Sequence, residues 1–288
     1  MLKKISTAIQ RALSDDMQDK IHLRESFERV PVLGSLIKSF TRIRAKLIQR
    51  TPEAYVRMQK RTYELYAAAD RVTEGRIDRD WVVGTWSKHD EWQDYEDYLM
   101  RYVPRDESWV ALDYGCGPGR NLRRWSSLFK RIDGVDISAN NLKNARAFLK
   151  GLPADKTPNL FVTEGMNCGD APKSAYDFVF STICIQHICV HRVRFSIFSS
   201  LYECLKPGGR ISIQMGYGVP SPNSVPYFEN YVESTQTNRG CDTAISSPDE
   251  PREDLEKIGF TNFEFWIRPV GPGDLHPNWI FFTAIKPG

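Results

Sequence analysis

The sequence Val110-Ala111-Leu112-Asp113-Tyr114-Gly115-Cys116-Gly117-Pro118-Gly119-Arg120 joins an apolar run, an acidic residue and three alternating glycines. A helix-like segment follows over residues 121–125. A strand, a tight glycine turn and a helix start form nucleotide-type binding sites at the carboxyl edge of parallel sheets. The dinucleotide fingerprint Gly-x-Gly-x-x-Gly would need its third glycine at Arg120 or Leu122. The stretch therefore predicts a site for a cofactor other than a dinucleotide.

Further strands and helices follow this turn in regular alternation. The second strand is expected over residues 131–136 and ends in Asp136, where an acid can accept hydrogen bonds from both ribose hydroxyls. Ser138 is expected to cap a helix that Gly151 closes. The remaining elements are expected as strands at 159–162, 176–181, 211–215, 263–267 and 279–284, a turn at 205–210, and a helix from Ser247 to Gly259.

Together these motifs resemble the class I S-adenosylmethionine-dependent methyltransferases, over about residues 105–288. The resemblance rests on the Gly-x-Gly-x-Gly turn, the acid that ends the second strand, the fourth strand and the Lys-Pro-Gly-Gly-Arg turn at 206–210. It implies an α/β fold, with a Rossmann-like, seven-stranded, mostly parallel sheet and helices on both faces. Residues 1–50 are expected to form a basic, helical N-terminal extension, and residues 51–104 a helical cap segment.

The resemblance implies S-adenosylmethionine as the cofactor and a set of residues that bind it. In the family, the segment before the glycine turn commonly folds over the cofactor, so Trp86, His89 and Trp92 are candidates to line the site. The loop after the third strand holds the adenine, and here Met166 and Asn167 stand where the family often has an aspartate. The expected cofactor-binding residues are Asp113, Gly115, Cys116, Gly117, Gly119, Asp136, Ile137, Met166, Asn167, Ser181, Thr182 and Trp86.

The chemistry of methyl transfer makes histidine the candidate catalytic base. The sulfonium is already activated, so the protein chiefly aligns the acceptor, but a hydroxyl acceptor usually needs a base with a pKa near the working pH. His187 follows the fourth strand, where acceptor and methyl group should meet, and is the first candidate; a helix-start histidine bonded to backbone is the alternative. His89 and His276 come next. His187 and His191 could share a helix face, but no third ligand is evident, so no metal site is expected.

The absence of three known motifs reduces the range of expected methyl acceptors. The segment after the fourth strand lacks the Asp/Asn-Pro-Pro-aromatic motif of base-amine methylation, the Pro-Cys of cytosine-C5 enzymes and the glutamate pair of protein-arginine enzymes. Residues 216–246, rich in proline and aromatics, are expected to form a substrate lid. The sequence favours methylation of a hydroxyl or amine of a small molecule or glycan. The alternatives are an RNA methyltransferase that uses the basic N-terminal region, and a cofactor-binding or scaffolding protein without turnover.

Composition sets the remaining expectations. Residues 1–61 carry a net charge of +8 and the rest of the chain −5. The N-terminal region is expected to be a solvated surface helix with one face on its own protein; contact with a membrane surface, a nucleic acid or a partner helix is the alternative. Of these partners, nucleic acid is the less expected. Six cysteines without a Cys-x-x-Cys pair suit a reducing compartment. No apolar run reaches the roughly 18 residues of a membrane span, so a cytoplasmic protein is expected.

Overall fold

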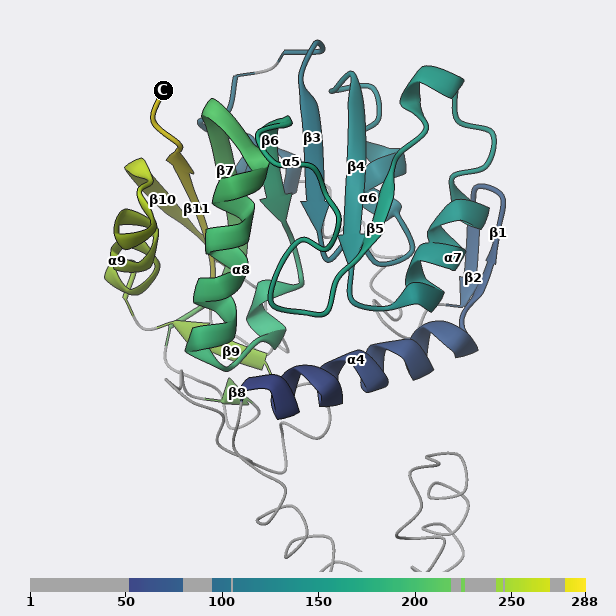
Figure 1. Cartoon of the computed structure of the whole chain (residues 1–288), viewed down its shortest axis with the longest axis horizontal. Helices are drawn as coiled ribbons and strands as arrows, with labels where there is room; N and C mark the ends of the chain where they lie inside the picture. The colour runs from purple at the N-terminus through teal and green to yellow at the C-terminus, as the bar shows by residue number, and fades with distance from the viewer. Residues whose placement is uncertain are drawn as a thin grey trace, which may run out of the picture. The chain divides into compact units, whose positions relative to one another are not determined.

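Seven strands lie side by side in the order β10-β11-β7-β6-β3-β4-β5 (Figure 1). Strands β3 to β7 are mutually parallel where they pair, whereas β11 is antiparallel to both of its neighbours, β7 and β10. This confirms the predicted Rossmann-like, mostly parallel sheet. The bounds are β3 Val110–Tyr114, β4 Arg131–Asp136, β5 Leu160–Val162, β6 Tyr176–Ser181, β7 Leu205–Tyr217, β10 Thr261–Pro269 and β11 Asn278–Ile285.

The computed structural model describes residues 52–79, 95–104, 106–218, 224–225, 242–245, 247–269 and 278–288. These residues belong to one unit, Arg50–Gly288. Two short strands, β8 (Ser224–Val225) and β9 (Asp242–Ile245), extend the sheet beside the end of β7. No helix in the described ranges is long and apolar enough to cross a membrane.

Each face of the sheet has its own apolar core. In β6, Val179 packs on the face covered by α8 (His191–Cys204) and α9 (Asp249–Ile258), while Phe178 and Phe180 pack on the opposite face. The opposite face is covered by α5 (Tyr95–Leu99), α6 (Arg120–Arg124) and α7 (Ala139–Phe148). Burial on both faces explains why the central strands are continuous apolar runs rather than alternating ones.

Local signals in the sequence set most of the element ends. Strands β4 and β6 begin and end at the predicted residues. The Ser138 side chain accepts a hydrogen bond from the Asn141 amide and caps α7, and Gly259, in the left-handed region, ends α9. The predicted turn at 205–210 does not precede the strand, as expected, but lies within it, because β7 already begins at Leu205. Tyr176 pairs with Leu205 and Phe178 with Arg210, so residues 206–209 loop out of the register.

The segment before the glycine turn contains more than helix. Helix α4 (Pro52–Ala69) begins near the start of the predicted helical cap segment, but a small antiparallel hairpin of β1 (Arg71–Thr73) and β2 (Arg76–Arg79) follows it. Tyr98 and Tyr102 then pack on the last two strands, with ring centroids 5.3 Å from Phe281 and 5.1 Å from Trp266. Trp86, His89, Trp92, His276, the extension 1–50 and most of the predicted lid lie outside the described residues.

Candidate functional site

A cavity of about 420 Å³ opens at the carboxyl edge of the sheet, where β3, β4, β5 and β6 end. The chain runs outward from β3 to β4 and β5 and then crosses back to β6 on the other side of β3, so the strand order reverses there. Such a switch point is where open α/β sheets bind ligands. The lining of the cavity includes Gly115, Cys116, Gly117, Asn121, Asp136, Ile137, Thr163, Gly165, Thr182, Ile183, Cys184 and His187, together with Tyr55, Val56, Gln59 and Tyr63 of α4.

The three glycines of the turn serve three different purposes. All have positive φ, at 78° for Gly115, 52° for Gly117 and 86° for Gly119. A Cβ on Gly115 would collide with the side chain of Cys184, and one on Gly119 would press against α7 at 3.0 Å from Leu149. A Cβ on Gly117 would meet nothing within 4 Å, and Gly117 lines the cavity. Gly117 is therefore the position where the backbone itself can approach a ligand.

Asp136 closes β4 and faces the cavity from between the glycine turn and α7. One carboxylate oxygen accepts the Gly117 amide at 2.8 Å; the other accepts the Ser138 amide at 2.8 Å and Nδ2 of Asn141 at 3.1 Å. Burial raises the pKa of Asp136, and these three hydrogen bonds oppose that rise. Because a carboxylate has about four acceptor positions, Asp136 can still accept from a ribose hydroxyl.

Asp113 lies behind the cavity wall. Its Oδ2 accepts a long hydrogen bond of 3.4 Å from Asn121, which lines the cavity and also donates to Thr182 at 3.0 Å. Burial raises the pKa of Asp113 to about 8; the Asn121 bond lowers it and the nearby Asp136 raises it. Among the described residues, Oδ1 of Asp113 has no hydrogen-bond partner. A buried carboxylate with a spare acceptor fits a cofactor that brings a cationic ammonium group.

The segment that leaves β6 is held under backbone strain. Ser181 donates to the Tyr114 carbonyl at 2.7 Å, so its side chain ties two strands together and is not part of the lining. Ile183 has a φ of 53°, which is rare for a β-branched residue, and its amide donates to Gln214 at 2.7 Å. Strained residues of this kind persist where the surroundings hold them, often at functional sites.

His187 lies in the 3-10 turn η4 (Ile185–His187), not on α8, and lines the cavity. Its ring centroid is 6.4 Å from that of Tyr63 on α4. The structure thus brings the first candidate base to the cavity, while its catalytic role stays a prediction. His191 instead approaches Asp254 with 2.7 Å between Nε2 and Oδ2, which links α8 to α9. No group of three metal-ligating side chains gathers in the part of the chain that the structure describes.

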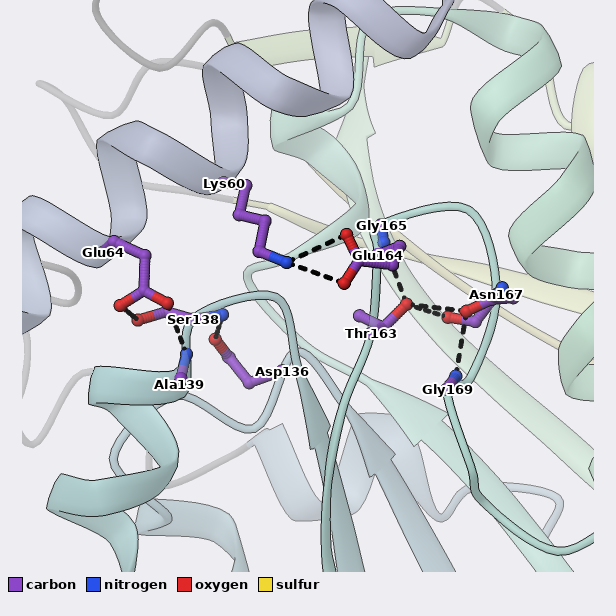
Figure 2. A network of polar contacts seen from close by, with 10 residues as sticks. All are labelled: Lys60, Glu64, Asp136, Ser138, Ala139, Thr163, Glu164, Gly165, Asn167 and Gly169. Carbon is purple, nitrogen blue, oxygen red and sulfur yellow. Dashed lines mark hydrogen bonds and ion pairs between the residues drawn. The ribbon is translucent and has the colours of Figure 1, made fainter.

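The loop after β5 differs from the expected adenine contacts. The side-chain oxygen of Asn167 accepts from Thr163 Oγ1 at 3.0 Å and from the Gly169 amide at 2.9 Å, so it holds the loop together (Figure 2). Met166 packs against the apolar core. Thr163 and Gly165 line the cavity in their place. Thr163 could have been found by a rule like the one that selected Asp136, since it is the polar residue directly after β5, as Asp136 is the polar residue that ends β4.

Residues 111–209 match the family described as "Methyltransferase domain". The chain carries a methyltransferase domain. Its motifs and strand order are those of the class I, S-adenosylmethionine-dependent enzymes. Trans-aconitate 2-methyltransferase of Azoarcus sp. (strain BH72) is 30% identical over 43% of this chain and 46% of its own. Phosphoethanolamine N-methyltransferase 2 of Caenorhabditis elegans is 34% identical over 43% of this chain and 27% of its own.

The solved structures agree on the fold of this methyltransferase domain. Phosphoethanolamine N-methyltransferase 2 of Haemonchus contortus, in complex with S-adenosyl-L-methionine, superposes with a TM-score of 0.52. The match has 22% identity and covers 71% of this chain and 56% of that one. The matched region spans less than half of each of the two curated relatives. The likeness therefore concerns the methyltransferase domain and leaves the acceptor open.

Proposed function

We propose that this protein binds S-adenosylmethionine in the cavity and transfers its methyl group to a hydroxyl or amine of a small molecule. The observation that carries the proposal is the bond between Gly117 and Asp136. It places a bare stretch of backbone and a buried carboxylate side by side on one cavity wall. The bound cofactor supplies a methyl group that its sulfonium has already activated.

Different residues of the site bind different parts of the cofactor. Asp113, behind Asn121, balances the ammonium of the amino-acid part, and Asp136 accepts from a ribose hydroxyl. The loop that contains Thr163 and Gly165 lies against the adenine of the cofactor. Each of these groups is held by the fold before any ligand binds, so little ordering is needed on binding.

On the acceptor side, His187 is the proposed base. Its main-chain oxygen accepts from Tyr55 at 2.5 Å and from Gln59 at 3.1 Å, so the turn is fixed through its backbone and the ring is not needed for that anchoring. An imidazole titrates near neutral pH and can take the proton of a hydroxyl as it attacks. An amine acceptor, delivered neutral, would need only the alignment that the cavity provides.

The charges of the lining favour an acceptor with an anionic group. Arg120, Arg123 and Arg124 all line the cavity, and Asp136 is the one carboxylate among the described lining residues. Arginine is well suited to bind carboxylates and phosphates. The acceptors named for the two curated relatives, trans-aconitate and phosphoethanolamine, both carry such groups.

The test is a transfer assay with methyl-labelled S-adenosylmethionine and a panel of small acceptors. The panel contains polycarboxylates, phosphomonoesters with a free amine or hydroxyl, and neutral counterparts of the same size, with total RNA as a further arm. The proposal expects label on an anionic small molecule. Transfer only to RNA, or binding of S-adenosylhomocysteine without transfer to any arm, would contradict it.

A further inference from the structure

Helix α4 is bound to the start of α7, beside the proposed ribose site (Figure 2). The Glu64 carboxylate accepts three hydrogen bonds there, from the Ala139 amide at 2.7 Å, the Ser138 hydroxyl at 3.0 Å and the Asn140 amide at 3.1 Å. The Ser138 amide in turn donates to Asp136. Glu64 thus fixes, through one residue, the carboxylate that faces the cavity. Charge-assisted bonds of a carboxylate to the first turn of a helix are strong ones.

The same helix reaches the loops after the next strands. Lys60 pairs with both carboxylate oxygens of Glu164, after β5, at 2.9 Å (Figure 2). At its other end, the buried Tyr55 hydroxyl donates to the His187 carbonyl, after β6, and accepts from the Cys189 amide at 3.2 Å. One helix is therefore bonded to the loops after β4, β5 and β6.

The distances along the helix suit this span. From Tyr55 to Glu64 the helix rises by about 14 Å, at about 1.5 Å per residue. Strands β6, β3 and β4 together span roughly 10 Å, because neighbouring strands lie about 4.8 Å apart. Between those two anchors, Val56, Gln59 and Tyr63 line the cavity. The helix consequently forms the wall of the site that stands opposite the strand ends, and Figure 1 shows it along that edge of the sheet.

Few apolar contacts hold this wall in place. Only Pro52, Tyr55, Val56, Gln59 and Ala67 of the 18 residues of α4 are buried. The Glu164 side chain is 79% exposed, so its pair with Lys60 adds little. The docking of α4 consequently depends on polar anchors. Beside those of Glu64 and Tyr55, Gln59 donates to the His187 carbonyl and Nδ2 of Asn144 donates to the Ala67 carbonyl at 2.9 Å. Elements with few buried apolar contacts are the ones that open locally.

The geometry points to α4 as a clasp that retains the bound cofactor, with Glu64 as the residue that positions Asp136 for the ribose. This inference rests on the proposed function, since it assumes S-adenosylmethionine in the cavity. It extends that function by assigning to Glu64 and Tyr55, neither of which belongs to the glycine turn or the strand ends, control over how long the cofactor stays bound.

The experiment measures binding and release of two probes, S-adenosylhomocysteine and its 2′-deoxy analogue, by the full-length chain. Tryptophan fluorescence can follow both, because Trp125 lines the cavity. The variants are Glu64→Gln, Tyr55→Phe and the control Arg57→Gln, at an exposed arginine of the same helix. Thermal unfolding of each variant reports on folding.

We expect Glu64→Gln to speed release of S-adenosylhomocysteine about tenfold, since losses of contact act mostly on dissociation. It should also shrink the preference for the ribose over the deoxyribose ligand, which a purely structural role would leave unchanged. Tyr55→Phe should speed release of both ligands alike and keep the preference, because its anchor lies at the other end of the helix. Arg57→Gln should match the parent.

Two results overturn the inference, and they are distinguishable. If the parent binds S-adenosylhomocysteine but Glu64→Gln and Tyr55→Phe release it as slowly as Arg57→Gln does, the clasp is wrong while the proposed function stands. If Glu64→Gln fails to fold, Tyr55→Phe alone decides this point. If the parent binds neither probe, the proposed function fails and the clasp with it.

Discussion

Cys184 occupies the space that a side chain at Gly115 would need. A Cβ on Gly115 would lie 2.6 Å from the Cβ of Cys184, well inside van der Waals contact. The glycine turn after β3 and the strained segment after β6 therefore interlock, and both line the same cavity. The absence of a side chain at position 115 thus lets two neighbouring strand ends form one site.

This contact predicts the effect of Gly115→Ala. The added methyl group must displace Cys184, so we expect a loss of at least about 2 kcal/mol in the free energy of unfolding and no measurable binding of S-adenosylhomocysteine. Gly208→Ala is the matched control, because Gly208 has nearly the same φ, 79°, and nothing within 4 Å of its added Cβ. Chemical denaturation of both variants checks this; equal losses would show that the backbone angle alone matters.

Gly117→Ala should separate binding from folding. Its Cβ meets no protein atom, so we expect a loss of only about 1 kcal/mol in unfolding free energy, from the positive φ. The methyl group nevertheless points into open space at a residue that lines the cavity, so cofactor affinity should fall at least tenfold. Calorimetry with S-adenosylhomocysteine measures the affinity. Unchanged affinity would mean that the ligand does not approach this stretch of backbone.

Asp113 should make stability fall as pH rises. Its pKa is raised to about 8 in the folded chain, against about 4 when unfolded, so between these values the folded state holds a proton that the unfolded state has lost. The melting temperature should therefore decrease from pH 5 to 9 more steeply in the parent than in Asp113→Asn. Parallel decreases in the two proteins would refute this role of Asp113.

The same carboxylate should couple ligand binding to proton release. If a cationic ammonium binds beside Asp113, the Asp113 carboxyl group loses its proton at pH 7. The calorimetric enthalpy of S-adenosylhomocysteine binding should then depend on the ionisation enthalpy of the buffer. Asp113→Asn should lack that component. A buffer-independent enthalpy in the parent would argue against an ammonium partner for Asp113.

His187→Ala tests the proposed base. Because Tyr55 and Gln59 hold the His187 carbonyl and not its ring, the variant should keep the turn and the cofactor affinity. With a hydroxyl acceptor, turnover should fall by about 10²–10⁴, and the limb of the pH–rate profile that belongs to the base should disappear. Near-normal turnover would place the base elsewhere, with His89 and His276 next to be tested, or indicate an amine acceptor.

Much of the sheet could be predicted from local sequence signals. The acid that ends β4, the serine that caps α7 and the glycine that ends α9 each act on residues within a turn of themselves, so Asp136, Ser138 and Gly259 can be interpreted without the fold. The hairpin of β1 and β2 was missed because its strands are short and largely charged, and thus lack an apolar pattern.

The wall formed by α4 could not be predicted in the same way. Glu64 meets Ser138 across 74 residues of sequence, and Tyr55 meets His187 across 132. Such contacts depend on how the helix is docked, which the spacing of its residues does not specify. Asn167 shows the reverse case: its position in the chain suggested a ligand contact, but its side chain completes hydrogen bonds within its own loop.

We infer that Asp136 and the glycine turn hold the ribose of S-adenosylmethionine. The most direct measurement is calorimetric titration of the parent and of Asp136→Asn with S-adenosylhomocysteine and with NAD. We expect the parent to bind S-adenosylhomocysteine and to give no response to NAD, and we expect Asp136→Asn to lose about 2–4 kcal/mol of binding free energy for S-adenosylhomocysteine. Equal affinity of the two proteins for S-adenosylhomocysteine, or binding of NAD alone, would contradict it.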